Sequence, residues 1–195
     1  MRAPTTAQTT GLVAFTLVTV VGLTILTSPD SPDEPKKPAS APSLLLFDIP
    51  GIDGTKERHN EISLIDADEI IGVSVDDKHR AYLVRAFTVP DFDTRNEEML
   101  SLLGRHVVND RLGDSPICVT FCDRNLCTRV LQTDGGESST LRLGGWKDGE
   151  MQLIVNGTRF AQNDSSLPLK DVAYEVTTWG VWKQAHPDSL VYTGI

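Results

Sequence analysis

All three cysteines of this 195-residue chain lie within ten residues of one another, in the segment ICVTFCDRNLCTRV. They are Cys118, Cys122 and Cys127. Cysteine thiolates act as nucleophiles, exchange disulfides and bind soft metal ions, so this cluster is the strongest sign of chemistry in the chain. A disulfide-stapled scaffold needs more cysteines than this, and folding must therefore depend on a hydrophobic core.

The residues around these cysteines predict a strand, a turn and a second strand. Because side chains alternate between the faces of a strand, Cys118, Thr120 and Cys122 are expected to share one face. The opposite face, toward the core, carries Ile117, Val119 and Phe121. The polar segment DRNL predicts the turn, and Cys127 begins the next strand. This arrangement is expected to bring Cys122 and Cys127 face to face.

Thiol redox is the first chemistry that this pair can support. In this interpretation Cys122 attacks, Cys127 resolves and Cys118 is a bystander. Arg124 and Arg129 flank the pair and favour thiolates, whereas Asp123 opposes them.

A metal site is the second chemistry that these residues can support. His106 lies one predicted hairpin arm before Cys122, so His106, Cys122 and Cys127 could together bind copper, zinc or iron. Three ligands leave one position open for water or substrate, and Asp110 could orient His106. His186 and Met151 are weaker candidates for a fourth ligand, since a structural role suits both.

A short structural disulfide between Cys122 and Cys127, in a non-catalytic binding module, is the third interpretation. Closing so small a loop stabilises a protein by less than ~3 kcal/mol. The sequence leaves all three interpretations open, and so leaves open whether the protein is an enzyme.

The pattern of elements predicts an α+β domain that is rich in β structure, with mostly antiparallel strands and hairpins and one or two short helices. Strands are expected at residues 70–75 and 80–89 with a turn at DDKH, and hairpins at KDGE and IVNGTRF. The segment TRNEEMLSLLG predicts a short helix ending at Gly104, and TTWGVWKQAHPD a helix stopped by Pro187.

The N-terminus predicts a membrane attachment. Residues 11–27 are uncharged and apolar, so residues 1–28 are expected to be a signal anchor or a signal peptide, with the anchor favoured. Residues 29–43 are a linker rich in proline and serine, and residues 44–195 a single soluble domain. The expected location of that domain is outside the cytoplasm, on the periplasmic or extracellular face.

The net charge of −9, from 27 acidic and 18 basic residues, argues against nucleic acid as a partner. The expected partners are instead the membrane, through the N-terminal helix, and a redox or metal-donor protein.

Three segments resemble the bacterial and archaeal family catalogued as Domain of Unknown Function 3179 (DUF3179): IGVSVDDKHRAYLVR, HVVNDRLGDSPICVTFC and TTWGVWKQAHPDSLVY, which together span about Ile70 to Tyr192. The residues that match its motifs are His106, Asn109, Asp110, Pro116, Val119, Thr120, Cys122 and Thr177 through Asp188. The chain departs from the family in having four residues, not two, between Cys122 and Cys127, and in having Phe121 where a tyrosine is usual.

The resemblance implies a site centred on Cys122 and Cys127, with His106 alongside and Asn109 and Asp110 in support. Some members of the family carry selenocysteine in this region, which favours redox chemistry. The resemblance implies no particular activity.

Overall fold

The computed structural model describes residues 44–55, 64–89, 102–136 and 140–194. Contacts between Cα atoms divide the chain into Met1–Ala39 and Ser40–Ile195, and every described residue belongs to the second unit. The predicted anchor and nearly all of the predicted helix at TRNEEMLSLLG lie outside the described residues.

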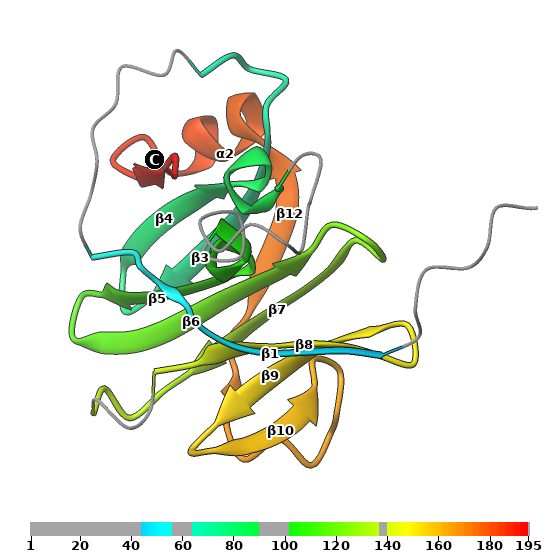
Figure 1. Cartoon of the computed structure of the whole chain (residues 1–195). Coiled ribbons are helices and arrows are strands. Elements are labelled where there is room, and N and C mark those ends of the chain that lie inside the picture. Colours follow the sequence, from blue (N-terminus) through cyan, green and yellow to red (C-terminus); the bar gives the residue numbers. More distant parts are fainter. Residues whose placement is uncertain (1–43, 56–63, 90–101, 137–139, 195) are drawn as a thin grey trace, which may run out of the picture. The chain divides into compact units, whose positions relative to one another are not determined.

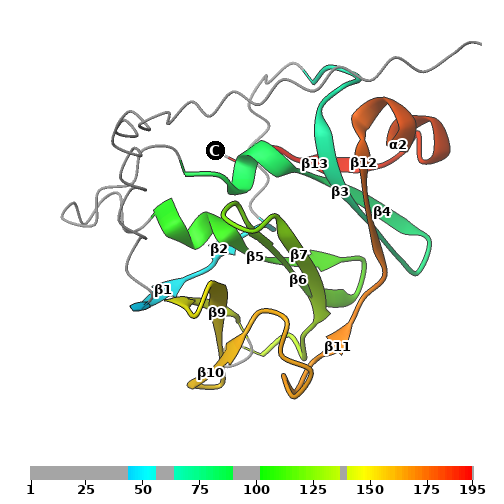
Figure 2. The ribbon, with the colours of Figure 1, turned by 90° about the vertical axis from the view of Figure 1, so that its right-hand side faces the viewer.

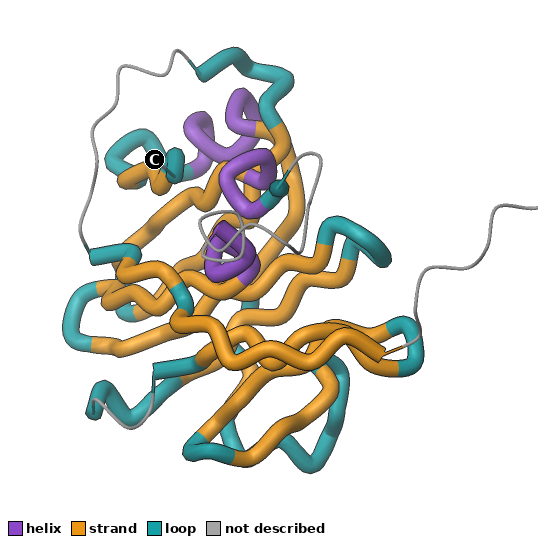
Figure 3. The backbone as a smooth tube through the Cα atoms, viewed as in Figure 1, coloured by secondary structure: helices purple, strands orange, loops and turns teal. Residues whose placement is uncertain are grey.

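Strands dominate the described part of the chain, and they form three sheets (Figures 1 and 3). The first sheet has the order β1-β8-β9-β10, from Leu44–Pro50, Arg142–Lys147, Glu150–Val155 and Thr158–Ala161. The middle sheet has the order β11-β7-β6-β5-β2, from Lys170–Asp171, Cys127–Gln132, Ser115–Cys122, Val107–Leu112 and Ile52–Asp53. The third sheet has the order β12-β3-β4-β13, from Tyr174–Thr178, Glu69–Val75, Lys78–Leu83 and Leu190–Tyr192.

Most neighbouring strands are antiparallel, as predicted. The described exceptions are β13 beside β4 and β2 beside β5, which are parallel. The described helices are short: α2 (Trp179–Ala185) and the 3-10 helices η1 (Val84–Phe87) and η2 (Leu103–His106). The predicted strand at residues 80–89 is therefore wrong beyond Leu83, where the chain turns into η1.

Tight turns join several strands as the sequence predicted. Asp148 and Gly149 connect β8 to β9, and Asn156 and Gly157 connect β9 to β10, all with positive φ. Positive φ at both central residues matches the right-handed twist of a hairpin, which is why Asn-Gly and Asp-Gly are favoured there. The predicted helix before Pro187 is also confirmed, since α2 ends at Ala185. It ends there because proline cannot continue a helix.

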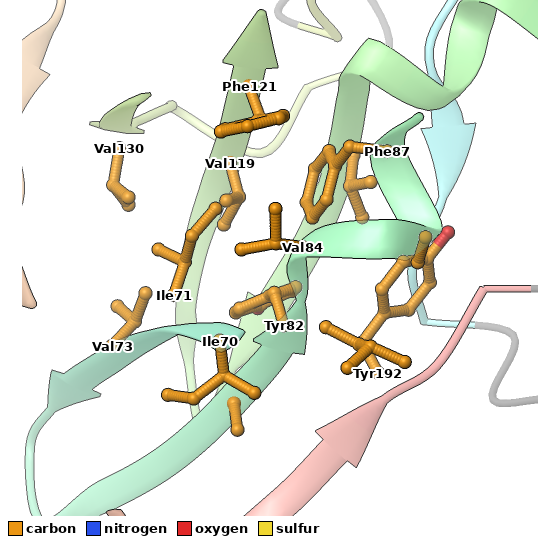
Figure 4. Close-up of a cluster of buried hydrophobic side chains, with 14 of the residues drawn as sticks. Ile70, Ile71, Val73, Tyr82, Val84, Phe87, Val119, Phe121, Val130 and Tyr192 are labelled. Carbon is orange, nitrogen blue, oxygen red and sulfur yellow. The ribbon is translucent and has the colours of Figure 1, made fainter. Parts of the chain in front are cut away.

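The middle sheet has a hydrophobic core on each face. One core packs β5, β6 and β7 against the third sheet, and Figure 4 shows its side chains pointing toward one another from β3, β4, β6, β7 and β13. The other core packs the opposite face of the middle sheet against β8 and β9. In Figure 2, β11 and β12 follow each other along one side, so the chain passes there from the edge of the middle sheet to the edge of the third.

Candidate functional site

The thiol hairpin, which we define as β6, β7 and the turn between them (Ser115–Gln132), places two cysteines directly opposite each other. Cys122 ends β6, Cys127 begins β7, and the two are Cα partners in the antiparallel register. Directly opposed residues on antiparallel strands have Cα atoms about 4.5–5.5 Å apart, within the 4.4–6.8 Å range that a disulfide spans. The predicted meeting of these two cysteines is therefore confirmed, and both are free thiols in the structure.

The turn between β6 and β7 contains a side-chain hydrogen bond and one residue with a left-handed backbone conformation. Asn125 accepts a hydrogen bond from the backbone N–H of Cys127 at its side-chain Oδ1, over 3.1 Å. Leu126 has a φ of 58°, a left-handed conformation that a bulky residue rarely adopts, and its side chain is 73% exposed. The turn therefore presents an exposed apolar side chain next to Cys127.

The alternation predicted for β6 is correct, but both faces of the strand are buried. Ile117, Val119 and Phe121 enter the core shared with the third sheet. Cys118 and Cys122 enter the core shared with the first sheet. Burial and the charge of Asp110 raise the pKa of Cys118 far above its usual value, so this thiol stays protonated and unreactive.

The two paired cysteines differ in access to solvent. Cys122 is fully buried, whereas Cys127 is partly exposed. The side-chain amide of Asn163 donates to the Cys127 sulfur at 3.6 Å, and Gln162 donates to the Cys127 carbonyl at 3.2 Å. This access favours Cys127 as the thiol that attacks and Cys122 as the one that resolves, the reverse of the roles inferred from the sequence.

His106 is tied to the same hairpin from the end of η2. Its Nδ1 donates to the carbonyl of Phe121 at 3.0 Å, so Nε2 carries the lone pair of the neutral ring. The Nε2 atom lies 3.9 Å from Oδ1 of Asp123, too far for a direct hydrogen bond. Burial lowers the pKa of His106 more than Asp123 and the Phe121 carbonyl raise it, and the charge of Arg124 lowers it further.

A cavity of about 230 Å³ lies beside the turn, which we call the turn cavity; its lining residues are Val89, Leu103, His106, Asp123, Arg124 and Trp146. Trp146 packs its ring edge-on against His106, with centroids 5.3 Å apart. The guanidinium of Arg124 lies 4.5 Å from the Trp146 ring centroid in a cation–π contact. The sequence identified His106 here but did not single out Trp146, which is far away in the chain on β8.

The side chains of Asn109 and Asp110 make their hydrogen bonds to residues other than His106. Asn109 makes two bonds to the backbone of Leu141, at 2.9 and 3.0 Å, and so ties β5 to the chain leading into β8. Asp110 lies on the side of the third sheet, where Arg80 and Tyr82 of β4 donate hydrogen bonds to its carboxylate at 2.6 and 2.7 Å. The expectation that these two residues support His106 is not met, because they bind other parts of the fold.

Within the parts of the chain that the structure describes, no group of three or more His, Cys, Asp and Glu side chains is arranged to hold a metal ion. The set of His106, Cys122 and Cys127 therefore stays a prediction. The two weaker candidates lie elsewhere: Met151 is buried in the core of the first sheet, and His186 stacks on His79 with ring centroids 4.0 Å apart.

No family model, curated protein or solved structure matches this chain. Among the described residues, no helix has both the length and the hydropathy needed to cross a membrane.

Proposed function

We propose that Cys122 and Cys127 form a dithiol–disulfide pair that exchanges electrons with a partner. The observation that carries this proposal is their direct pairing in the hairpin, with one thiol buried and the other partly exposed. The exposed thiol can reach an external disulfide, while the buried one can reach only its neighbour.

The reaction follows from this asymmetry. The Cys127 thiolate attacks one sulfur of a partner disulfide, which forms a mixed disulfide and releases the first partner thiol. Cys122 then loses its proton and attacks the Cys127 sulfur, which forms the Cys122–Cys127 bond and releases the second partner thiol. The two electrons lost by the dithiol have then reduced the partner disulfide to two thiols.

The surroundings of Cys127 support this role. The Asn163 amide donates to the sulfur that carries negative charge during attack. Leu126, 73% exposed beside it, offers an apolar contact for a partner protein. His106 is neutral near pH 7 and can accept a proton at Nε2.

A metal site is a second candidate, supported by the bond from His106 Nδ1 to the Phe121 carbonyl. Metal-binding histidines commonly donate their second ring nitrogen in this way, which leaves the other free for the ion. A copper, zinc or iron ion would take Cys122 and Cys127 as thiolate ligands.

We also propose that residues 1–28 anchor the protein in a membrane, with the thiol hairpin outside the cytoplasm. The apolar run of residues 11–27 and the following linker support this location. A redox or metal-donor protein is then the natural partner. Membership of the DUF3179 family is likewise proposed, on the three segments that resemble it.

The test is the mass of the intact chain after equilibration in reducing and oxidising glutathione buffers. A reversible loss of two hydrogens, absent in both Cys122→Ser and Cys127→Ser and retained in Cys118→Ser, is expected. A disulfide that only unfolding and strong reductant can break would instead support the structural interpretation and overturn the redox function. Native mass spectrometry without chelator tests the metal candidate, which predicts one bound ion that His106→Ala loses.

A further inference from the structure

Arg129 is held in an ion pair near the reactive thiol. It lies on β7 two residues after Cys127, so the two side chains share one face of the strand. The arginine side chain is only 13% exposed, and its Nε and Nη2 donate to the two carboxylate oxygens of Asp171 at 2.6 and 3.3 Å. Because this carboxylate offsets the positive charge, the direct electrostatic effect of Arg129 on Cys127 is small.

The remaining nitrogen of Arg129 binds the backbone of a segment that is distant in the sequence. Nη1 donates to the carbonyl of Gln162 at 2.7 Å and to the carbonyl of Asp164 at 2.9 Å. These carbonyls flank Asn163, so a single nitrogen fixes the chain on both sides of that residue. We call residues 162–164, which directly follow β10, the clamp segment. The arginine fastens the clamp segment to β7 through charge-assisted hydrogen bonds.

The clamp segment makes two contacts with Cys127. Gln162 Nε2 donates to the carbonyl of Cys127 at 3.2 Å, and Asn163 Nδ2 donates to its sulfur at 3.6 Å. The first contact fixes the backbone of the cysteine, and the second reaches the atom that reacts. Asn163 is itself exposed, so keeping its amide on the sulfur costs conformational entropy unless its backbone is already fixed. The bonds from Arg129 fix that backbone.

A buried network links the same residues a second time. Gln162 is fully buried, and its Nε2 also donates to the hydroxyl of Thr120 at 2.9 Å, which in turn donates to the carbonyl of Arg129 at 2.9 Å. The Thr120 proton is thus in use and the Cys127 carbonyl can only accept, so the amide must direct its NH₂ group to both. Its Oε1 atom has no hydrogen-bond partner among the described residues. The fold tolerates this unpaired acceptor and keeps both donors in place, which rigidifies the backbone around Cys127.

We propose that Arg129 is a positioning residue for thiol exchange, which holds the clamp segment so that Asn163 stabilises the attacking Cys127 thiolate. This inference rests on the thiol function proposed above. An amide donor favours the anionic thiolate over the neutral thiol, because hydrogen bonds to charged groups are the stronger ones. Asn163 contacts the reacting sulfur, whereas Arg129 acts through the backbone on either side of Asn163.

The experiment measures alkylation of Cys127 in the reduced full chain. Short pulses of iodoacetamide at pH 7 and at the high-pH plateau are followed by peptide mass mapping, which separates Cys127 from the other two cysteines. The ratio of the two rates reports the fraction of Cys127 present as thiolate at pH 7, while the plateau rate alone reports its accessibility. Asn163→Leu should lower this ratio about fivefold, as the loss of one modest charge-assisted hydrogen bond predicts.

Variants of Arg129 distinguish positioning from a direct effect of charge. Arg129→Gln should lower the ratio nearly as much as Asn163→Leu does. Arg129→Lys keeps the charge but lacks the planar fork that binds Asp171 and two carbonyls together, so it should lower the ratio as well. A wild-type ratio in Arg129→Lys would overturn the proposal. So would a higher ratio in Asp171→Asn, because removing that carboxylate would strengthen a direct effect of the arginine charge. If Arg129→Gln does not fold, Arg129→Lys carries the comparison.

A double variant tests whether Arg129 acts through Asn163. Arg129→Gln combined with Asn163→Leu should give the same ratio as Asn163→Leu alone, whereas additive losses would refute this route. Arg142→Gln is the matched control, because Arg142 also pairs with an aspartate and its loss changes the net charge equally. It lies on β8 of the first sheet and should leave the ratio unchanged.

The outcome does not depend on the proposed redox function, because alkylation requires no disulfide exchange. A lowered ratio in Arg129→Gln, in a chain that shows no reversible loss of two hydrogens in glutathione buffers, would support the positioning role and refute the redox function. Reversible exchange together with an unchanged ratio in Arg129→Gln would refute the positioning role and leave the redox function standing.

Discussion

His106 donates a hydrogen bond from Nδ1 to the carbonyl of Phe121, at 3.0 Å, and Phe121 immediately precedes Cys122. This bond joins η2 to the thiol hairpin through the backbone and selects one tautomer of the ring. It places the basic Nε2 atom of a buried histidine at the turn cavity, beside Asp123 and Arg124.

The lowered pKa of His106 predicts how stability depends on pH. The unfolded chain takes up a proton at this histidine near pH 6.5, whereas the folded chain does so only at lower pH. The unfolded state therefore binds more protons in this window, so stability should fall as pH drops below about 6.5 and the loss should level off below the folded pKa. Urea unfolding between pH 7.5 and pH 5 should show this fall, and His106→Gln should reduce it. His79→Gln, which removes a different histidine, is the control. An equal fall in wild type and in His106→Gln would contradict the assignment of this pH dependence to His106.

Thiol accessibility should differ sharply along the thiol hairpin. Iodoacetamide added to the reduced native protein should modify Cys127 first, because Cys118 and Cys122 are fully buried. Peptide mass mapping after a short pulse is the measurement, with urea-unfolded protein as the reference in which all three react. Faster labelling of Cys122 than of Cys127 would restore the roles first inferred from the sequence.

The buried ion pair between Arg80 and Asp110 should be essential for stability. The Asp110 side chain is fully buried and accepts from Arg80 and Tyr82. Asp110→Ala leaves the Arg80 charge without this partner in the core, and should reduce the free energy of unfolding by about 3–5 kcal/mol. The exposed pair of Asp48 and Arg142 is the control, and Asp48→Ala should cost less than about 1 kcal/mol. If urea titrations gave the two variants equal losses in the free energy of unfolding, the prediction that the buried pair of Arg80 and Asp110 matters more than the exposed pair would be wrong.

Leu126 should carry backbone strain that glycine relieves. With a φ of 58° and no burial to stabilise it, Leu126→Gly should raise the free energy of unfolding by up to ~1 kcal/mol. Leu126→Ala retains the Cβ atom and should not gain this stability. If the exposed leucine contacts a redox partner, Leu126→Gly should also slow exchange with a protein disulfide more than exchange with bis(2-hydroxyethyl) disulfide. Destabilisation by glycine in denaturant titrations would contradict the strain.

The sequence by itself determined the local structure around the cysteines. Alternating residues in ICVTFC specified which side chains share a face, and the polar DRNL specified a turn that pairs Cys122 with Cys127. The Asp-Gly and Asn-Gly turns and the helix before Pro187 were also predictable, because each depends on the conformational preferences of adjacent residues.

Only the tertiary structure decided which thiol is exposed and what surrounds His106. The first sheet covers Cys122 and brings Trp146 of β8 against His106, although β8 is far from η2 in the chain. The third sheet brings Arg80 to Asp110, which removes that carboxylate from the site where its sequence position suggested it belonged. These contacts depend on how separate sheets pack, which the alternation within one strand does not encode, because both faces of the middle sheet are buried and apolar.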